Sequence, residues 1–110
     1  MKQKEYISAR CPIRTTLEML GGKWRLLIIN AIGDQSKRYG EIRTALPDIS
    51  EKMLAQELSI LVDNDILIKN TYNEVPPKVE YQLTENGFKA LELLEPIRKF
   101  GLEYQSKMKD

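Results

Sequence analysis

Polar side chains recur at helical spacing between residues 50 and 63. They are Lys52, Gln56 and Ser59, and Ala55 falls on the same side of such a helix. In the major groove of DNA a glutamine can pair bidentately with adenine, and a lysine can reach guanine or a phosphate. The spacing therefore indicates a helix that could read base edges, with Lys52 and Gln56 as the leading candidates. Periodicity alone fits an ordinary solvent-exposed helix face equally well.

Basic residues on both sides of this segment favour a contact with nucleic acid. Lys37, Arg38 and Arg43 flank the helix predicted before it. Lys69 and Lys78 bracket a hairpin predicted after it. If the hairpin packs beside the polar helix, these cations lie on one side and can neutralise phosphates. The full set of predicted DNA contacts is Lys37, Arg38, Arg43, Ser50, Lys52, Met53, Gln56, Ser59, Lys69 and Lys78.

The overall composition argues against catalysis and, taken alone, gives no case for DNA binding. The 17 basic and 16 acidic residues leave a net charge of only +1. With no histidine and a single cysteine, Cys11, the usual zinc sites and the Ser-His-Asp or Cys-His catalytic arrangements cannot be assembled within one chain. Gly21-Gly22 is an isolated pair rather than a phosphate-binding loop. We therefore predict a protein without enzymatic activity, metal or cofactor.

Length and hydropathy predict one domain that stays away from membranes. A chain of 110 residues has room for one modest core, so residues 1–110 are predicted to form a single domain. The longest apolar stretch, from Leu26 to Ile29, is far too short to cross a bilayer, and no secretory apolar run follows Met1. These features predict a cytoplasmic protein with no membrane partner.

Helix boundaries are marked by residues that start or stop a helix. Pro12 is suited to a first helical turn, and Gly21-Gly22 stops the apolar repeat that follows. Ser50 is suited to cap a later helix with Leu54, Leu58 and Leu61 as its inward stripe. The predicted helices cover residues 12–20, 23–32, 39–46 and 50–63, the second largely buried with Leu27 in its apolar face.

The second half of the chain predicts a pair of strands and a last helix. Residues 66–72 are rich in β-branched and aliphatic side chains, and residues 79–83 alternate between apolar and polar, with a turn-prone segment at 73–77. From Thr84 the helical spacing resumes through Met108, with a bend at Pro96. The predicted fold class is therefore mainly α with a small β-hairpin, in the order of a winged helix–turn–helix.

Several motifs, in this order, resemble those of the HxlR-type winged-helix regulators. They are Gly21-Gly22-Lys23-Trp24, Arg38-Tyr39, Ile49-Ser50-Glu51-Lys52-Met53-Leu54 and Val75-Pro76-Pro77-Lys78-Val79-Glu80-Tyr81-Gln82-Leu83-Thr84. The similarity covers residues 11–101. It implies a dimeric transcription regulator related in fold to the MarR group, with the helix from Ser50 as the recognition helix and residues 73–78 as the wing.

The resemblance also implies how two subunits pair. In such proteins the N-terminal segment and the last helix form the dimer, so residues 11–84 become the DNA-binding core, and residues 1–20 and 85–110 the dimerisation helices. The implied interface residues are Ile7, Ile13, Leu17, Ile97, Phe100, Tyr104 and Met108. From the sequence, burial of these side chains in the core of a single chain fits equally well.

Two positions depart from the family's pattern. Asp65 replaces the usual glycine between recognition helix and wing, and Phe100 replaces a frequent tryptophan. Aspartate tolerates the left-handed backbone conformation, at some cost relative to glycine. We therefore expect the same turn at Asp65, with the wing slightly displaced.

Cys11 matches a position at which some HxlR-type members carry a thiol that senses oxidants or electrophiles. A place near a helix N-terminus favours the reactive thiolate, and Arg10 and Arg14 add positive charge nearby. The alternative is a half-buried, small apolar side chain without a sensing role. Redox sensing through Cys11 is therefore one of two interpretations.

These features together predict a sequence-specific regulator that binds double-stranded DNA as a homodimer. A pseudo-palindromic operator would have half-sites about one helical turn apart, and repression by blocking polymerase is the simplest output for so small a chain. The competing hypothesis is a winged-helix module for protein–protein assembly without DNA contact, which suits the net charge of +1. The sequence does not identify a small-molecule effector.

Overall fold

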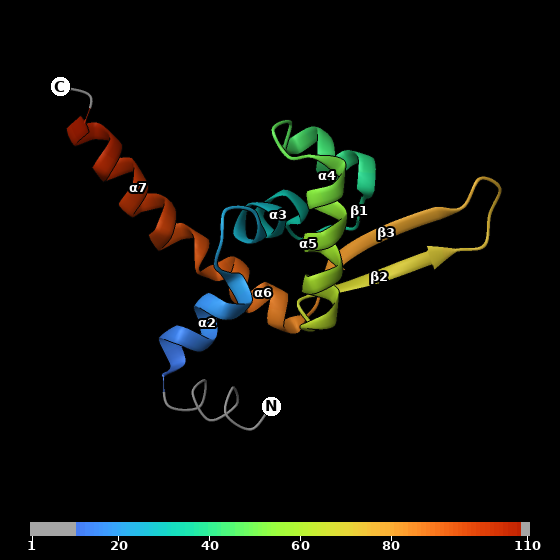
Figure 1. The fold of residues 1–110 in the computed structure, drawn as a ribbon, viewed down its shortest axis with the longest axis horizontal. Coiled ribbons are helices and arrows are strands. Elements are labelled where there is room, and N and C mark those ends of the chain that lie inside the picture. Colours follow the sequence, from blue (N-terminus) through green and yellow to red (C-terminus); the bar gives the residue numbers. More distant parts are fainter. Residues whose placement is uncertain (1–10, 109–110) are drawn as a thin grey trace.

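The computed structural model describes residues 11–108, which form helices around a small antiparallel sheet (Figure 1). In chain order the elements are α2 (Pro12–Leu20), α3 (Arg25–Ile32), β1 (Lys37–Arg38), α4 (Tyr39–Ala45), α5 (Glu51–Asp63), β2 (Leu67–Tyr72), β3 (Lys78–Leu83), α6 (Glu85–Glu92) and α7 (Leu94–Met108). The predicted fold class is confirmed, because a helix–turn–helix made of α4 and α5 is followed directly by the β2–β3 hairpin.

The core lies where α3, α4 and α5 pack against the sheet. Its largest fully buried side chains are Ile28, Ile29, Ile32, Ile42, Ile49, Leu54, Leu58 and Leu61. The three leucines of α5 recur every three or four residues, so one stripe of that helix is buried, as predicted. The expectation for α3 was wrong at Leu27, which is 43% exposed, because its side of α3 faces a hollow beside α7 instead of the core.

The sheet has one more strand than predicted. The hairpin pairs β2 with β3 from Leu67↔Leu83 to Tyr72↔Lys78. β1, of only two residues, adds to the other edge of β3, so the strand order is β1-β3-β2. A strand of two residues has no periodicity of its own, and it exists here because Lys37 and Arg38 reach Tyr81 and Glu80, far away in the sequence.

The predicted bend at Pro96 is a break about one turn earlier. α6 ends at Glu92 and α7 begins at Leu94. Proline has no N–H, so the carbonyl of Glu92, four residues before Pro96, cannot receive its normal helical hydrogen bond. The Leu93 N–H donates to the Ala90 carbonyl at 3.0 Å, which tightens the last turn of α6. The helix therefore breaks where the bond is lost, not where the proline stands.

The turns on both sides of the hairpin are set by single residues. Asp65 has a φ of 62°, so the left-handed turn expected at this position is confirmed. Thr84 caps α6, because its side-chain oxygen accepts from the Gly87 N–H at 3.0 Å. The Thr84 hydroxyl also donates to the Asp65 carbonyl at 2.6 Å, which ties the start of α6 to the turn that precedes β2.

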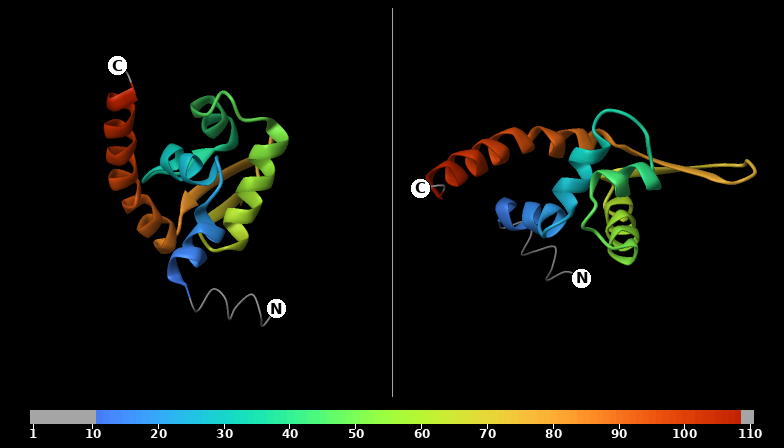
Figure 2. Two further views of the ribbon diagram at one scale, coloured as in Figure 1. Left: turned by 60° about the vertical axis from the view of Figure 1, so that its left-hand side comes forward. Right: turned by 90° about the horizontal axis from the view of Figure 1, so that it is seen from above.

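α7 and the hairpin extend away from the core in opposite directions (Figures 1 and 2). Along its 15 residues α7 has no buried side chain, which distinguishes it from the core helices. Within residues 11–108, no helix combines the length and the apolar character that crossing a membrane requires.

Candidate nucleic-acid interface

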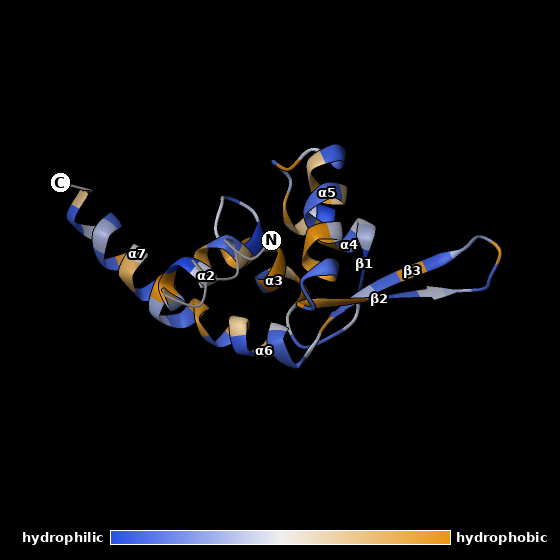
Figure 3. Cartoon of the chain, turned by 60° about the horizontal axis from the view of Figure 1, so that its bottom comes forward, coloured by the Kyte–Doolittle hydropathy of each residue, from blue (hydrophilic) through white to orange (hydrophobic). Residues whose placement is uncertain are grey.

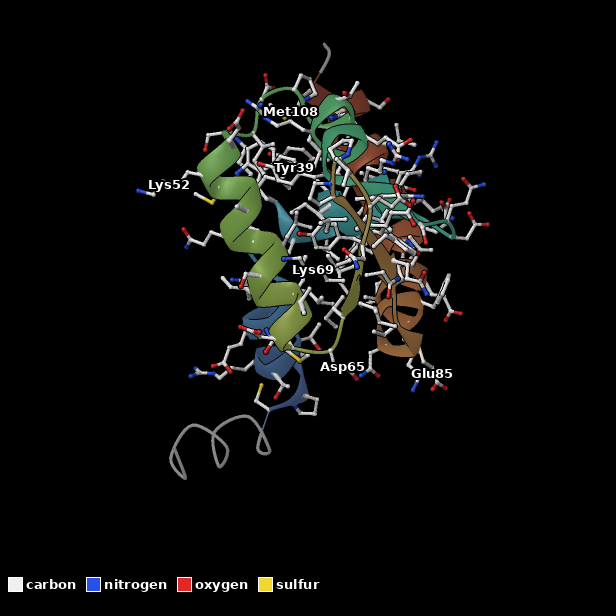
Figure 4. All side chains as sticks on the ribbon, turned by 90° about the vertical axis from the view of Figure 1, so that its right-hand side faces the viewer. Tyr39, Lys52, Asp65, Lys69, Glu85 and Met108 are labelled. Atoms are coloured by element: carbon white, nitrogen blue, oxygen red, sulfur yellow. The ribbon has the colours of Figure 1, made fainter. Side chains whose placement is uncertain are left out.

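The outer face of α5 is uncovered. Lys52, Ala55, Gln56 and Ser59 are all exposed, opposite the buried leucine stripe. Figure 4 looks onto the side of the molecule that carries both α5 and the hairpin, and Lys52 points away from the body there. The structure therefore brings the two leading base-reading candidates, Lys52 and Gln56, onto one open surface.

Three contacts fix the start of α5. The Met53 N–H donates to the Ser50 side-chain oxygen at 3.0 Å, so Ser50 is the helix cap, as predicted. The Tyr39 hydroxyl donates to the Glu51 carbonyl at 3.1 Å, and Arg43 Nη1 lies 2.9 Å from Glu51 Oε2. Since Tyr39 and Arg43 are one turn apart on α4, these contacts hold the angle between the two helices of the motif. The role of Tyr39 was not found from the sequence beyond its place in the Arg38-Tyr39 motif.

Lys37 is engaged within the chain. Its Nζ donates to the carbonyls of Ala31 and Ile32, each at 3.1 Å, at the C-terminal end of α3. A cation at that end of a helix is favourable, because the last carbonyls lack helical partners and carry partial negative charge. Lys37 therefore stabilises the end of α3, which makes it a poorer candidate for a phosphate contact than the sequence indicated.

Lys69 lies next to the outer face of α5. It is exposed on β2, and with Ser59, Ala55 and Tyr39 it lines a hollow of about 330 Å³ between α5 and the sheet (Figure 4). Arg38, at the end of β1, is also exposed. Lys69 thus borders the polar helix surface from the sheet side, and Arg43 borders it from α4 through its ion pair with Glu51. Arg38 lines a different hollow, between the start of α4 and the hairpin.

Lys78 is held within the hairpin. Its Nζ lies 3.4 Å from Glu80 Oε2 and 4.9 Å from the centre of the Tyr72 ring. The side chain of Lys78 is only 28% exposed. The hairpin tip beyond it consists of exposed residues, including Glu74 and the fully exposed Val75. The two lysines that bracket the hairpin thus lie on its strands, and the tip itself exposes a carboxylate and an apolar side chain.

The apolar side chains assigned to a subunit interface are on the outside of the chain. Their exposed fractions range from 50% to 72%, so the alternative that they form the core of one chain is wrong. They are Ile13 and Leu17 of α2 and Ile97, Phe100, Tyr104 and Met108 of α7. Ile7 lies outside the described residues. The structure adds Leu93 and Leu102, which are exposed on the same part of the chain.

Cys11 is a half-buried free thiol immediately before α2. It occupies the N-cap position, but its side chain makes no capping hydrogen bond. Its carbonyl accepts from the Thr15 N–H at 3.0 Å. Arg14 is exposed in the first turn, and Arg10 lies outside the described residues. The position matches the helix start predicted from Pro12.

Potential metal ligands are scattered in the described part of the chain. Among residues 11–108 no three acidic or cysteine side chains come close enough together to hold a metal ion. Within the described residues, α5, the edge of α4 and the hairpin form a surface that combines polar and basic groups.

Comparisons with known proteins agree with this geometry. Residues 19–109 match the HxlR-like helix-turn-helix family. MalR of Fusobacterium mortiferum, named as a regulatory protein, is 43% identical over 95 residues, which are 86% of this chain and 90% of MalR. The family match extends through the recognition-helix candidate, the hairpin and α7.

Solved structures show the same arrangement. A MarR-family transcriptional regulator from Porphyromonas gingivalis is 48% identical, with a TM-score of 0.81 over 84% of this chain and 91% of that one. The redox regulator HypR, in its oxidized form, is 35% identical, with a TM-score of 0.79 over 84% of this chain and 96% of HypR. The fold described above is thus shared with winged-helix regulators of the MarR type.

Proposed function

This chain belongs to the HxlR-like helix-turn-helix family of transcriptional regulators, and from that premise we propose that it binds specific sequences in duplex DNA. The observation that carries the proposal is the open polar face of α5, opposite a fully buried leucine stripe. A helix held out in this way can enter a major groove of roughly 12 Å width.

We assign separate roles to the residues on this surface. Lys52 and Gln56 read base edges, since they lie on the outer face of α5 and carry the donors and acceptors that bidentate pairing requires. Met53 and Ser59 border them, and Ser50 presents the helix start. The phosphate contacts come from Arg38, Arg43 and Lys69. Lys37 and Lys78 contribute less, because two carbonyls hold the Lys37 ammonium group and the Lys78 side chain is only 28% exposed. Arg43 is also paired, with Glu51, but that ion pair lies on the surface, with the two side chains 40% and 72% exposed.

We propose that two copies bind one operator. α7 buries none of its side chains in its own chain, and exposed apolar residues follow one another along α2 and α7. Large exposed apolar surfaces of this kind mark protein–protein contacts. Residues 11–84 then bind DNA, while residues 1–20 and 85–110 pair the subunits, and the half-sites lie about one helical turn (roughly 34–36 Å) or a multiple apart. The output is repression, by covering the site that polymerase needs.

The salt dependence of binding tests this function against the alternative of a protein–protein module. Three phosphate contacts in each subunit make six in a dimer, and each neutralised phosphate contributes about −0.9 to the slope of log affinity against log salt. We expect a slope of roughly −5 on a duplex selected from a random pool. A protein–protein module would select no duplex at all, even at low salt.

A second part of the proposal concerns Cys11. The similarity to HypR, a redox regulator, and the half-buried thiol at the start of α2 favour oxidation of Cys11 as the regulating event. Diamide would accept two electrons and two protons from two Cys11 thiols, which become a disulfide between subunits. We expect diamide to release the DNA from the wild-type protein and not from Cys11→Ser. Equal release from both would remove Cys11 from the mechanism.

A further inference from the structure

We propose that the hairpin tip contacts the minor groove of DNA through the apolar side chain of Val75 and thereby selects A·T over G·C base pairs there. The inference rests on the DNA-binding function proposed above and adds a specificity-determining residue outside α5.

The side chain of Val75 packs against no other part of the chain, so it contributes nothing to the core. Its side chain is 100% exposed at the end of the hairpin, where Figure 3 shows an apolar segment at the loop. The usual residues of turns are Gly, Pro, Asn, Asp and Ser. Asn73, Pro76 and Pro77 belong to this group, whereas Val75 does not. Here Pro76 and Pro77 follow Val75, and each proline ring fixes its backbone φ. The tip is thus a stiff apolar projection.

The charges near the hairpin tip do not favour a phosphate contact there, because the charged residue among residues 73–77 is Glu74. Residues 67–83 contain two lysines and two glutamates, so the hairpin has no net charge. Lys78 is already paired with Glu80. Glu74 lines a hollow together with Arg38 near the start of α4, whereas Val75 is not part of that hollow. Val75 is therefore an apolar side chain at the tip that lies outside this hollow and is fully open to a partner.

The length of the hairpin matches the spacing of the grooves. A strand of six residues, such as β2, spans about 20 Å at roughly 3.3 Å per residue. Half a helical turn of DNA, which separates a major groove from the adjacent minor groove, is about 17 Å. The hairpin leaves the core on the side that carries α5 (Figures 2 and 4). With α5 in the major groove, the tip therefore reaches the neighbouring minor groove.

The chemistry of the minor groove determines what valine can recognise. An A·T pair presents only acceptors there, whereas a G·C pair adds the N2 amino group of guanine. Valine has no acceptor for that amino group, and covering an unpaired donor is unfavourable. Proteins that bind the minor groove frequently insert apolar side chains there, besides the basic and amide side chains that read its edges. Val75 therefore excludes guanine without any hydrogen bond of its own.

Inosine provides the direct test. An I·C pair has the major-groove edge of G·C but lacks the N2 amino group, so it isolates the feature that Val75 would detect. The duplex is one selected by the wild-type protein from a random pool, with its outer flanks located by footprinting and rebuilt as A·T, I·C or G·C. We expect equal affinity for the A·T and I·C flanks and at least about fivefold weaker binding to the G·C flank.

Two variants complete the experiment. Val75→Thr keeps the shape of the side chain and adds an oxygen that can accept from guanine, so the difference between the I·C and G·C flanks should disappear. Ile68→Thr, at another exposed β-branched position of the same hairpin, should retain the difference. Equal wild-type affinity for I·C and G·C flanks, or an unchanged difference in Val75→Thr, overturns this inference alone. Failure to select any duplex overturns the DNA-binding proposal with it.

Discussion

Arg25 of α3 and Glu57 of α5 form an ion pair beneath the recognition-helix candidate, with Nε 2.8 Å from Oε1. The same guanidinium donates through Nη1 to the carbonyls of Glu18, at 2.9 Å, and Met19, at 3.3 Å, in the last turn of α2. One side chain thus connects the helix that follows Cys11 to the helix assigned to DNA. Neither partner was singled out by the sequence, because the contact spans 32 residues.

Loss of the Glu57 carboxylate should destabilise the fold. The side chains of Arg25 and Glu57 are only 18% and 13% exposed, so Glu57→Gln leaves a largely covered cation without its counter-charge. We expect the free energy of unfolding in urea to fall by about 1–3 kcal/mol. The matched control is Glu95→Gln, which breaks an exposed pair with Arg98 and should change stability by less than about 0.5 kcal/mol. Similar losses in both variants would show that the Arg25 contact is no stronger than a surface pair.

Gln56→Ala and Lys69→Ala should weaken DNA binding in different ways. Gln56 is assigned to a base edge, so its loss should cost about 1–3 kcal/mol at one base pair and relax the preference there. Lys69 is assigned to a phosphate, so its loss should weaken every sequence alike and reduce the salt slope by about 0.9 per contact. Competition binding against a panel of single-base variants separates the two. A uniform loss for Gln56→Ala would reassign this residue to the backbone.

Phe100→Asp should dissociate the proposed dimer while each chain stays folded. Phe100 is 71% exposed and stacks on Tyr104 with ring centres 6.4 Å apart, so it contributes little to the core of its own chain. A carboxylate placed in an apolar subunit contact would lose its hydration without gaining a partner. Sedimentation velocity should show the mass of one chain, with unchanged helical circular dichroism. Lys99→Asp, a charge change at the adjacent exposed position of α7, is the control, and a dimeric Phe100→Asp protein would place the interface elsewhere.

The free energy of unfolding should fall at alkaline pH, because the buried Tyr81 side chain loses its proton there. Burial raises the pKa of Tyr81 above its ordinary value of 10.0, and the nearby Tyr39 raises it further. The folded state therefore binds this proton more tightly than the unfolded state does. The contribution of protonated Tyr81 to the free energy of unfolding is complete below about pH 10, and it is lost as the pH rises through the pKa of Tyr81 in the folded state. Urea unfolding from about pH 8 to about pH 11 should show a smaller decline in Tyr81→Phe than in the wild type. Parallel declines would exclude Tyr81 as the cause.

Much of the fold could be predicted from the sequence because it depends on neighbouring residues. The Ser50 cap, the leucine stripe of α5 and the left-handed turn at Asp65 each follow from residues within a turn or so of one another. The alternation of residues 79–83 likewise predicted β3. Local patterns of this kind also place Lys52 and Gln56 on one face of a helix.

The position of each charge depended on the tertiary structure. Lys37 and Lys78 looked like equivalent surface cations, but one caps α3 and the other lies against Glu80 and Tyr72. Lys69 became part of the α5 surface only because β2 packs beside that helix. β1 exists only through its pairing with β3. Sequence spacing determines which face of a helix or strand a side chain occupies. Only packing brings distant elements together, and it therefore decides which cations of the protein remain open to a partner.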